Sequence, residues 1–195
     1  MAHIKLTKNE LKKHKDSLKR FLRYLPTLQL KKQQLQMVLR SIEQKQAVVR
    51  EKLQNLQEGL DTWVALFADQ QDVSNYLSIQ EVRVSITNIA GTDIPVFEGI
   101  NFHIEPYDLF STPLWVDSGI ECMQNSIGLE IELKVLEEQY RRIAQELKIT
   151  SQRVNLFEKV KIPETREYIR AIQIYLGDQQ TAAVVRGKIA KNKVA

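Results

Sequence analysis

The feature that most constrains the fold is a hydrophobic seam that repeats every seven residues from Ile4 to Phe67. About 15 of its 19 positions are apolar, and the register has no stutter. A straight α-helix drifts by about 20° per heptad relative to such a repeat, so a seam of this length favours a left-handed supercoil against a partner helix. The two seam positions hold Ile4, Leu11, Leu18, Leu25, Lys32, Leu39, Gln46, Leu53, Leu60 and Phe67, and Thr7, His14, Phe21, Leu28, Leu35, Ile42, Val49, Leu56 and Trp63.

The first helix has a predicted start and one disturbance. Thr7 and Glu10 have the spacing of a capping box, which places the first turn near Thr7. Pro26 removes a backbone donor and costs about 3 kcal/mol in an ordinary helix interior. Because the seam resumes in register at Leu28, we expect a kink inside one long helix that ends near Leu77, with two shorter helices as the alternative.

A two-residue repeat follows and predicts a β-hairpin. Its first strand alternates β-branched and polar residues over 82–87, and its second covers 96–104. Gly91 falls in the predicted turn, Pro95 suits a strand edge, and Gly99 indicates a bulge.

A second heptad-patterned helix is predicted from a capping box at Ser118–Glu121 to about Ala190. We therefore expect a mainly α fold, a long antiparallel two-helix coiled coil with a small β-hairpin insertion, in which both basic termini meet at one end. The expected divisions are residues 1–78, 79–117 and 118–195. The second seam holds Leu129, Leu133, Leu136, Tyr140, Ile143, Leu147, Thr150, Val154 and Phe157.

Composition and charge narrow the possible settings. The single cysteine, Cys122, excludes an intrachain disulfide and fits a reducing compartment. No apolar run approaches the ~20 residues of a membrane span, so we expect a cytoplasmic protein without direct membrane insertion. Residues 1–50 carry about +10 and residues 186–195 about +4, which leaves about −10 for the middle of a chain whose net charge is +4.

The chain shows no recognisable catalytic or cofactor motif. Neither G-x-x-x-x-G-K-[ST] nor G-x-G-x-x-G occurs. His3, His14 and His103 are scattered, and no H-E-x-x-H or C-x-x-C offers metal spacing. We expect no catalytic residue, no bound cofactor and no metal site.

The basic first helix allows several interpretations. Lys12, Lys13, Arg20 and Arg23 occupy positions outside the seam, where a solvated face is the simplest explanation. The same charges would suit insertion into an acidic protein cavity. Nucleic acid or an anionic membrane surface is a further alternative.

Three stretches of the chain carry motifs that are similar to those of one known protein family. Residues 153–158 (R-V-N-L-F-E), followed by Ile162 and Pro163, resemble the family's R-V-N-x-x-E…I-P signature. Residues 88–95 resemble its N-x-x-G-x-x-x-P turn. Residues 28–35 are similar to its L-L-K-x-K-R-D-x-L stretch, but Gln33 and Gln34 replace the usual Arg-Asp pair.

On these motifs the chain resembles, over nearly its whole length, the D subunit of the V-type and A-type rotary ATPases. The resemblance implies a non-catalytic central-stalk rotor. The implied partners are the catalytic and non-catalytic subunits of the ATPase hexamer, which would surround the terminal ends of both helices. The small F subunit of the central stalk and the socket subunit that joins the membrane ring would contact the hairpin end. The implied location is cytoplasmic and peripheral to the membrane. The candidate partner-binding or structural residues are Lys12, Lys13, Arg20, Arg23, Lys31, Lys32, Arg153, Asn155, Glu158, Ile162, Pro163, Gly91 and Pro95.

Two departures from the family pattern concern the C-terminal end. It lacks the extended charged tail of many members, and residues 181–187 lack the usual Phe-Arg-Leu-Lys-type stretch. A prefoldin-like coiled-coil chaperone is the best rival interpretation, and a nucleic-acid-binding coiled-coil arm is the third.

Overall fold

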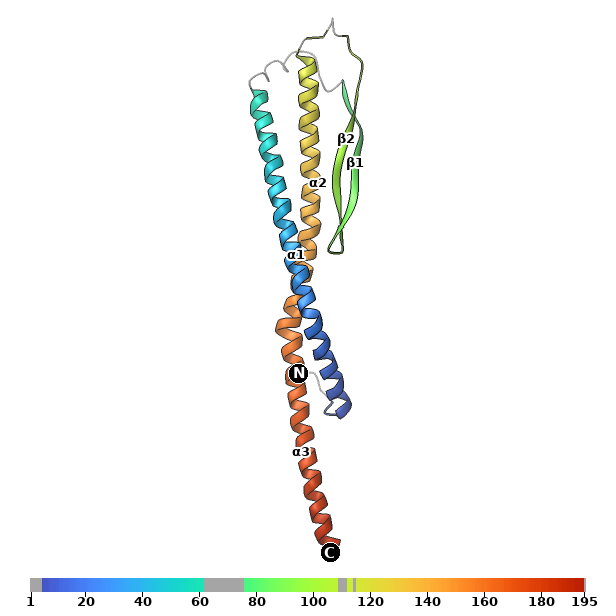
Figure 1. The fold of residues 1–195 in the computed structure, drawn as a ribbon, viewed down its shortest axis with the longest axis vertical. Coiled ribbons are helices and arrows are strands. Elements are labelled where there is room, and N and C mark those ends of the chain that lie inside the picture. The colour runs from blue at the N-terminus through green and yellow to red at the C-terminus, as the bar shows by residue number, and fades with distance from the viewer. Residues whose placement is uncertain (1–4, 62–75, 109–111, 114, 195) are drawn as a thin grey trace. The chain divides into compact units, whose positions relative to one another are not determined.

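The computed structural model of the chain describes residues 5–61, 76–108, 112, 113 and 115–194. This part of the chain is mainly helical and contains one antiparallel β-hairpin, as the sequence predicts (Figure 1). The supercoiling of the helices stays a prediction. In chain order the elements are α1 (Lys8–Asp61), β1 (Leu77–Ile89), β2 (Thr92–Ile104), α2 (Val116–Asn155), the π-helix η3 (Leu156–Lys161) and α3 (Ile162–Val194).

The start of α1 confirms the predicted N-cap. The backbone N–H of Glu10 donates to Thr7 Oγ1 over 3.3 Å, which satisfies one of the donors left over in the first turn. The carboxylate of Glu10 instead pairs with Lys13 at 3.3 Å. The helix continues through Pro26, so one long helix is confirmed and two shorter ones are not.

Two boundaries differ from the sequence prediction. Leu77 belongs to β1, so the first helix does not reach it, and residues 62–75 lie outside the described part. The second long helix begins at Val116, before the predicted cap at Ser118. Val116 and Ile120 are buried in an apolar cluster with Leu77 and Trp115, which fixes the first turn without the Ser118 hydroxyl.

The chain divides into two compact units. Unit 1 consists of Met1–Gln33 with Lys148–Ala195, and unit 2 consists of Gln34–Leu147. In both units the seam positions predicted on the helices are the buried or half-buried ones, from Leu11 to Leu56 on α1 and from Leu129 to Phe157 on the second helix.

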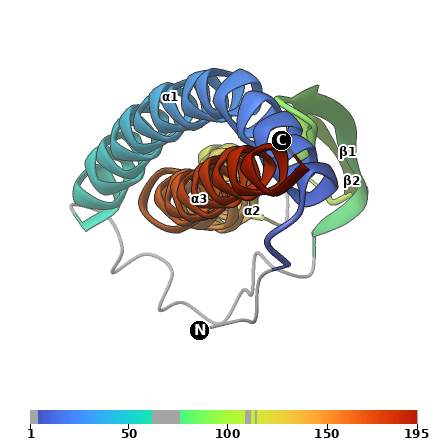
Figure 2. The same ribbon diagram turned by 90° about the horizontal axis from the view of Figure 1, so that it is seen from below.

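Unit 2 has a core built from three elements. The hairpin runs alongside α2 (Figure 1), and its two strands also lie side by side in the view from below (Figure 2). Because α1, β2 and α2 all contribute side chains, this core is covered from several directions. Its buried residues are Leu35, Ile42, Val49, Ile94, Leu136 and Ile143.

Unit 1 pairs α1 with the second helix through ring contacts. His14 lies edge-on to Tyr168, with ring centroids 5.3 Å apart, and Phe21 lies 5.3 Å from Phe157. The order of these contacts makes the two helices antiparallel. Because His14 already reaches Tyr168, the last turns of α3 extend past the described start of α1. The expected meeting of two matched helix ends is therefore not observed for the described residues.

Candidate functional site: the hairpin, its groove and the π-helix

The hairpin turn has the backbone geometry that the sequence predicts. Ala90 (φ 51°) and Gly91 (φ 80°) both adopt positive φ, the requirement of the two-residue turn that matches strand twist. Asn88 Oδ1 accepts the N–H of Gly91 over 3.0 Å, and its amide donates to Asp93 at 2.6 Å. Gly91 thus has a structural role in the turn.

The predicted bulge at Gly99 is confirmed. Arg83 pairs with Gly99, but the next residue, Val84, pairs with Phe97, so Glu98 is the extra residue. Gly99 has φ 153°, and a Cβ there would lie 3.3 Å from the guanidinium of Arg83. A bulge re-aims the side chains beside it, and Val96 and Phe97, the two residues before this bulge, both line the groove described below.

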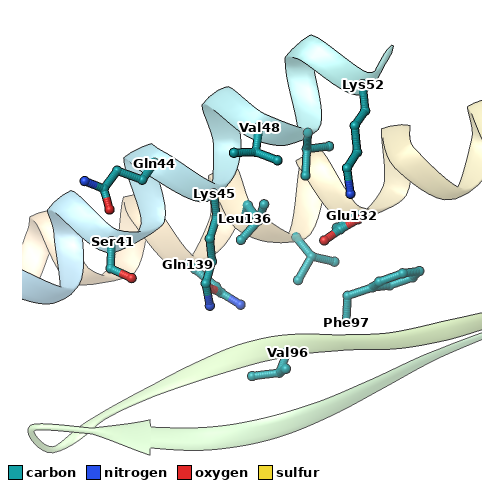
Figure 3. Close-up of a pocket in the computed structure, with 12 residues that line it drawn as sticks. Ser41, Gln44, Lys45, Val48, Lys52, Val96, Phe97, Glu132, Leu136 and Gln139 are labelled. Carbon is teal, nitrogen blue, oxygen red and sulfur yellow. The ribbon is translucent and has the colours of Figure 1, made fainter. Parts of the chain in front are cut away.

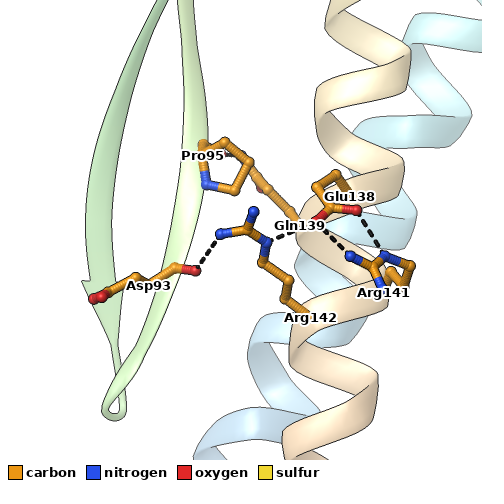
Figure 4. A network of polar contacts seen from close by, with 6 residues as sticks. All are labelled: Asp93, Pro95, Glu138, Gln139, Arg141 and Arg142. Atoms are coloured by element: carbon orange, nitrogen blue, oxygen red, sulfur yellow. Dashed lines mark hydrogen bonds and ion pairs between the residues drawn. The ribbon is translucent and has the colours of Figure 1, made fainter.

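A polar network fastens the hairpin to α2 (Figure 4). Gln139 donates to the carbonyl of Pro95 over 2.5 Å, and Arg142 donates to the carbonyl of Asp93 over 3.0 Å. Glu138 accepts 2.7 Å bonds from Arg141 and Arg142, which lower the pKa of its carboxyl to about 2. Pro95 has no N–H to donate, so at this edge position only its carbonyl is used.

A groove opens beside this network, between α1, α2 and β2 (Figure 3). Its volume is about 520 Å³, and a second hollow of about 470 Å³ shares Lys52, Phe97 and Glu132 with it. Val48 and Leu136 supply apolar surface, while Lys45 and Lys52 stand on the α1 side and Glu132 on the α2 side. A groove with apolar surface and charged edges suits a segment of another protein rather than a small polar metabolite.

The outer face of β1 is an exposed apolar row. Ile86 is 75% exposed, whereas Ile94, on the neighbouring strand, is 3% exposed and belongs to the core. The two-residue period thus identifies the strand but not which face is covered. The row consists of Ile79, Val82, Val84 and Ile86.

The predicted basic residues on α1 do not converge on one point. Lys12, Lys13, Arg20 and Arg23 are exposed, and Lys31 and Lys32 are half-buried. Lys13 pairs with Glu10, and Arg20 donates to Ser17 over 3.3 Å. Lys12, Lys13, Arg20 and Arg23 thus belong to a solvent-facing basic surface of unit 1.

The signature residues 153–163 surround a feature that the sequence patterns did not predict. Arg153 and Asn155 end α2, and Glu158 lies in η3, all three exposed. Ile162 is buried in the seam, and Pro163 follows it on the surface. In the sequence, Val160 falls three residues after Phe157 and hides the signal, because only its exposure shows that the seam spacing widens to five between Phe157 and Ile162.

The described residues contain no cluster of three or more His, Cys, Asp or Glu side chains placed to hold a metal ion. Among these residues, no helix combines the length and the apolar character that a membrane crossing requires.

The chain is similar to one known family over nearly its whole length. Residues 10–192 match the family described as the D subunit of ATP synthase. The V-type ATP synthase D subunit of Borreliella burgdorferi is 50% identical over 194 residues, covering 100% of this chain and 96% of the relative. Subunits of the same name from Chlamydia felis and Chlamydia caviae are 32% and 33% identical, each over 99% of this chain and 94% of the relative. These matches give no support to the chaperone or nucleic-acid alternatives. The chain belongs to the family of ATP synthase D subunits and is a central-stalk subunit of a V-type ATPase complex.

Proposed function

We propose that this chain is the non-catalytic rotor shaft of its complex. It turns within the hexamer that hydrolyses or synthesises ATP and passes torque to or from the membrane ring that moves ions. The observation that carries this proposal is the pairing of two long helices by a buried seam in each unit. A paired helix resists bending and twisting better than one helix, as torque transfer requires.

We assign the helix ends of unit 1 to the hexamer. Val184, Val185 and Ile189 are exposed near the end of α3, among Arg186, Lys188 and further basic residues. The exposed Lys12, Lys13, Arg20 and Arg23 of α1 add positive charge to the same unit. Lysine and arginine side chains combine an apolar stem with a charged head. They therefore favour a loose fit to both the acidic and the apolar surfaces of the catalytic and non-catalytic subunits.

We assign the surfaces of unit 2 to the lower partners, the F subunit and the socket subunit. The groove offers apolar surface between charged edges, and the β1 row exposes four apolar side chains in line. Aligned exposed apolar residues of this kind mark protein contacts more often than solvent-facing surface. Attachment to the membrane sector runs through the socket subunit in this proposal.

Two matched substitutions test the assignment in the assembled complex. Ile86→Asp should reduce recovery of the F subunit or the socket subunit about tenfold or more, because a buried carboxylate costs several kcal/mol. Ile189→Asp should instead weaken recovery of the hexamer. Each variant controls for the other, since both replace an exposed isoleucine by aspartate. Equal recovery of every ATPase subunit with both variants would overturn these assignments.

The non-catalytic role has its own test. The purified chain should hydrolyse no ATP, whereas the hexamer reconstituted with it should do so. Turnover by the rigorously purified chain alone would contradict the proposal.

A further inference from the structure

The buried stripe of the second helix skips one residue at the π-helix. Before η3 the buried and half-buried seam residues are Thr150, Val154 and Phe157, at alternating spacings of four and three. After η3 the stripe continues with the same alternation, but it starts five residues beyond Phe157 instead of four. The seam residues of α3 are Ile162, Thr165, Ile169, Ile172 and Leu176.

The extra residue is held in the π-helix by a wider hydrogen bond. The N–H of Ile162 donates to the carbonyl of Phe157, five residues earlier, where an α-helix would use four. Without this skip, the heptad would centre the seam on Lys161, Glu164 and Tyr168. With it, these three side chains flank the seam half-buried, with Tyr168 against His14, and Ile162 and Ile172 take the buried positions.

Pro163 fixes the position of this turn. In an α-helix its ring would clash with the carbonyl four residues earlier, and its missing N–H would leave that carbonyl without a donor. A widened turn directly before Pro163 relieves the clash. The Thr165 hydroxyl donates to the carbonyl of Lys161 over 2.6 Å, which satisfies one acceptor at the end of the turn.

The opposite helix is also interrupted close by. Phe21 contacts Phe157 at the start of η3, and Pro26 lies five residues further along α1. Pro26 cannot donate to the carbonyl of Leu22. Because the two helices are antiparallel, Pro26 faces the last turns of α2, on the other side of the Phe21–Phe157 contact from η3, so the two interruptions adjoin without coinciding. Leu156 and Val160 of η3 are about half exposed.

We propose that η3 and Pro163, with the interruption at Pro26 beside them on α1, form a compliant joint within unit 1, where the paired helices bend and twist more easily than on either side. The inference rests on the proposed rotor function only for the use of the joint. That use is to store part of the energy of each rotation step as elastic deformation. The joint itself is a property of this chain. Ile162 and Pro163, which belong to the family signature over residues 153–163, have a physical role in it.

Amide hydrogen exchange of the full chain tests the joint directly. Amides in residues 157–162 should exchange about tenfold faster than those in residues 149–154. Equal protection of the two stretches would overturn the proposal.

A single-residue deletion tests the skip. Deleting Lys159 restores four-residue spacing between Phe157 and Ile162, but it returns Pro163 to an α-helical turn. The deletion of Lys159 combined with Pro163→Ala should therefore be more stable than the deletion alone, and its amides around 157–162 should exchange about tenfold more slowly than in the natural chain. Pro163→Ala alone should show no such gain.

The matched control is the deletion of Arg166, which also removes one exposed basic residue. It moves Ile169, Ile172 and Leu176 out of the seam, so protection of α3 should be lost. The combined variant lacks Lys159 and carries Pro163→Ala. If it loses as much protection of α3 as the deletion of Arg166 does, η3 does not serve to add one residue between the two parts of the seam.

Rotation measurements test the use of the joint. In the reconstituted complex, the deletion of Lys159 with Pro163→Ala should narrow the angular fluctuations of a bead carried by the rotor during each pause. If amide exchange is slowed but the angular fluctuations are unchanged, the joint stands and its elastic role is refuted. Failure of the natural chain to assemble with the hexamer would instead refute the rotor proposal.

Discussion

The same seven-residue repeat is buried to different degrees in the two units. On α1, the seam residues of unit 1 from Leu11 to Lys32 are half-buried, whereas Leu35, Ile42, Gln46 and Val49 of unit 2 are buried. The difference follows from a third element, since the hairpin adds Ile94, Ile89 and Ala90 to the helix contacts of unit 2. On α1, the heptad repeat thus specifies which residues face the partner, and the hairpin layer accompanies their fuller burial in unit 2. On the second helix, Val154, Ile162 and Ile172 of unit 1 are buried without such a layer.

The largest test of this difference compares two identical substitutions one heptad apart. Leu35→Ala should cost about 3 kcal/mol, because the side chain has no exposed surface and its loss leaves a cavity. Leu28→Ala, at the same seam position in unit 1, should cost about half as much. Hydrogen exchange in each unit measures the two effects separately, and equal costs would show that the hairpin layer adds nothing.

The next test loosens the hairpin. Arg142→Ala removes the bond to the Asp93 carbonyl and should destabilise hairpin docking by about 1–2 kcal/mol. Arg141→Ala is the control, because Arg141 also bonds Glu138 but has no bond to the hairpin in this network. Faster exchange of the β1 and β2 amides in the first variant alone is the expected result.

A smaller effect concerns the bulge. Gly99→Ala places a side chain at φ 153° and should cost about 1 kcal/mol. Gly128→Ala, in α2 with open space around it, should instead stabilise unit 2 by about 0.5–1 kcal/mol. Thermal unfolding should therefore show a lower melting temperature for Gly99→Ala and a higher one for Gly128→Ala. An unchanged melting temperature for Gly99→Ala would show that the bulge does not require glycine at this position.

The smallest expected effect is the pH dependence of the network. Glu138 has a pKa lowered from 4.5 to about 2 in the folded chain by bonds from Arg141 and Arg142. Its stabilising effect is therefore present above pH 4.5 and is lost as the pH falls through about 2. NMR titration of the Glu138 carboxyl should give a midpoint at about pH 2. Glu138→Gln should reduce the difference in unfolding free energy between pH 5 and pH 2. A midpoint near 4.5 would show that the arginines are not held in place.

Periodicity predicted most of the fold and little of the surface chemistry. Seam residues such as Leu35 and Ile143 were predictable, because burial in a helix pair follows sequence spacing directly. The turn at Gly91 was predictable because positive φ favours glycine. The exposure of Ile86 was not, because a period of two marks both faces of a strand alike. The start of α2 at Val116 depended on tertiary packing that outweighed the Ser118 cap.

The antiparallel pairing also has a consequence for how the chain is made. Arg50 meets Glu137 across 87 residues of sequence, and His14 meets Tyr168 across a longer stretch still. A ribosome that adds about 5–20 residues per second leaves the early seam of α1 without its partner for on the order of ten seconds. Doubling a loop costs only about 0.6 kcal/mol, so closure can proceed from the hairpin towards the termini with little added penalty. During synthesis, the first half of the seam is therefore a transient target for chaperones.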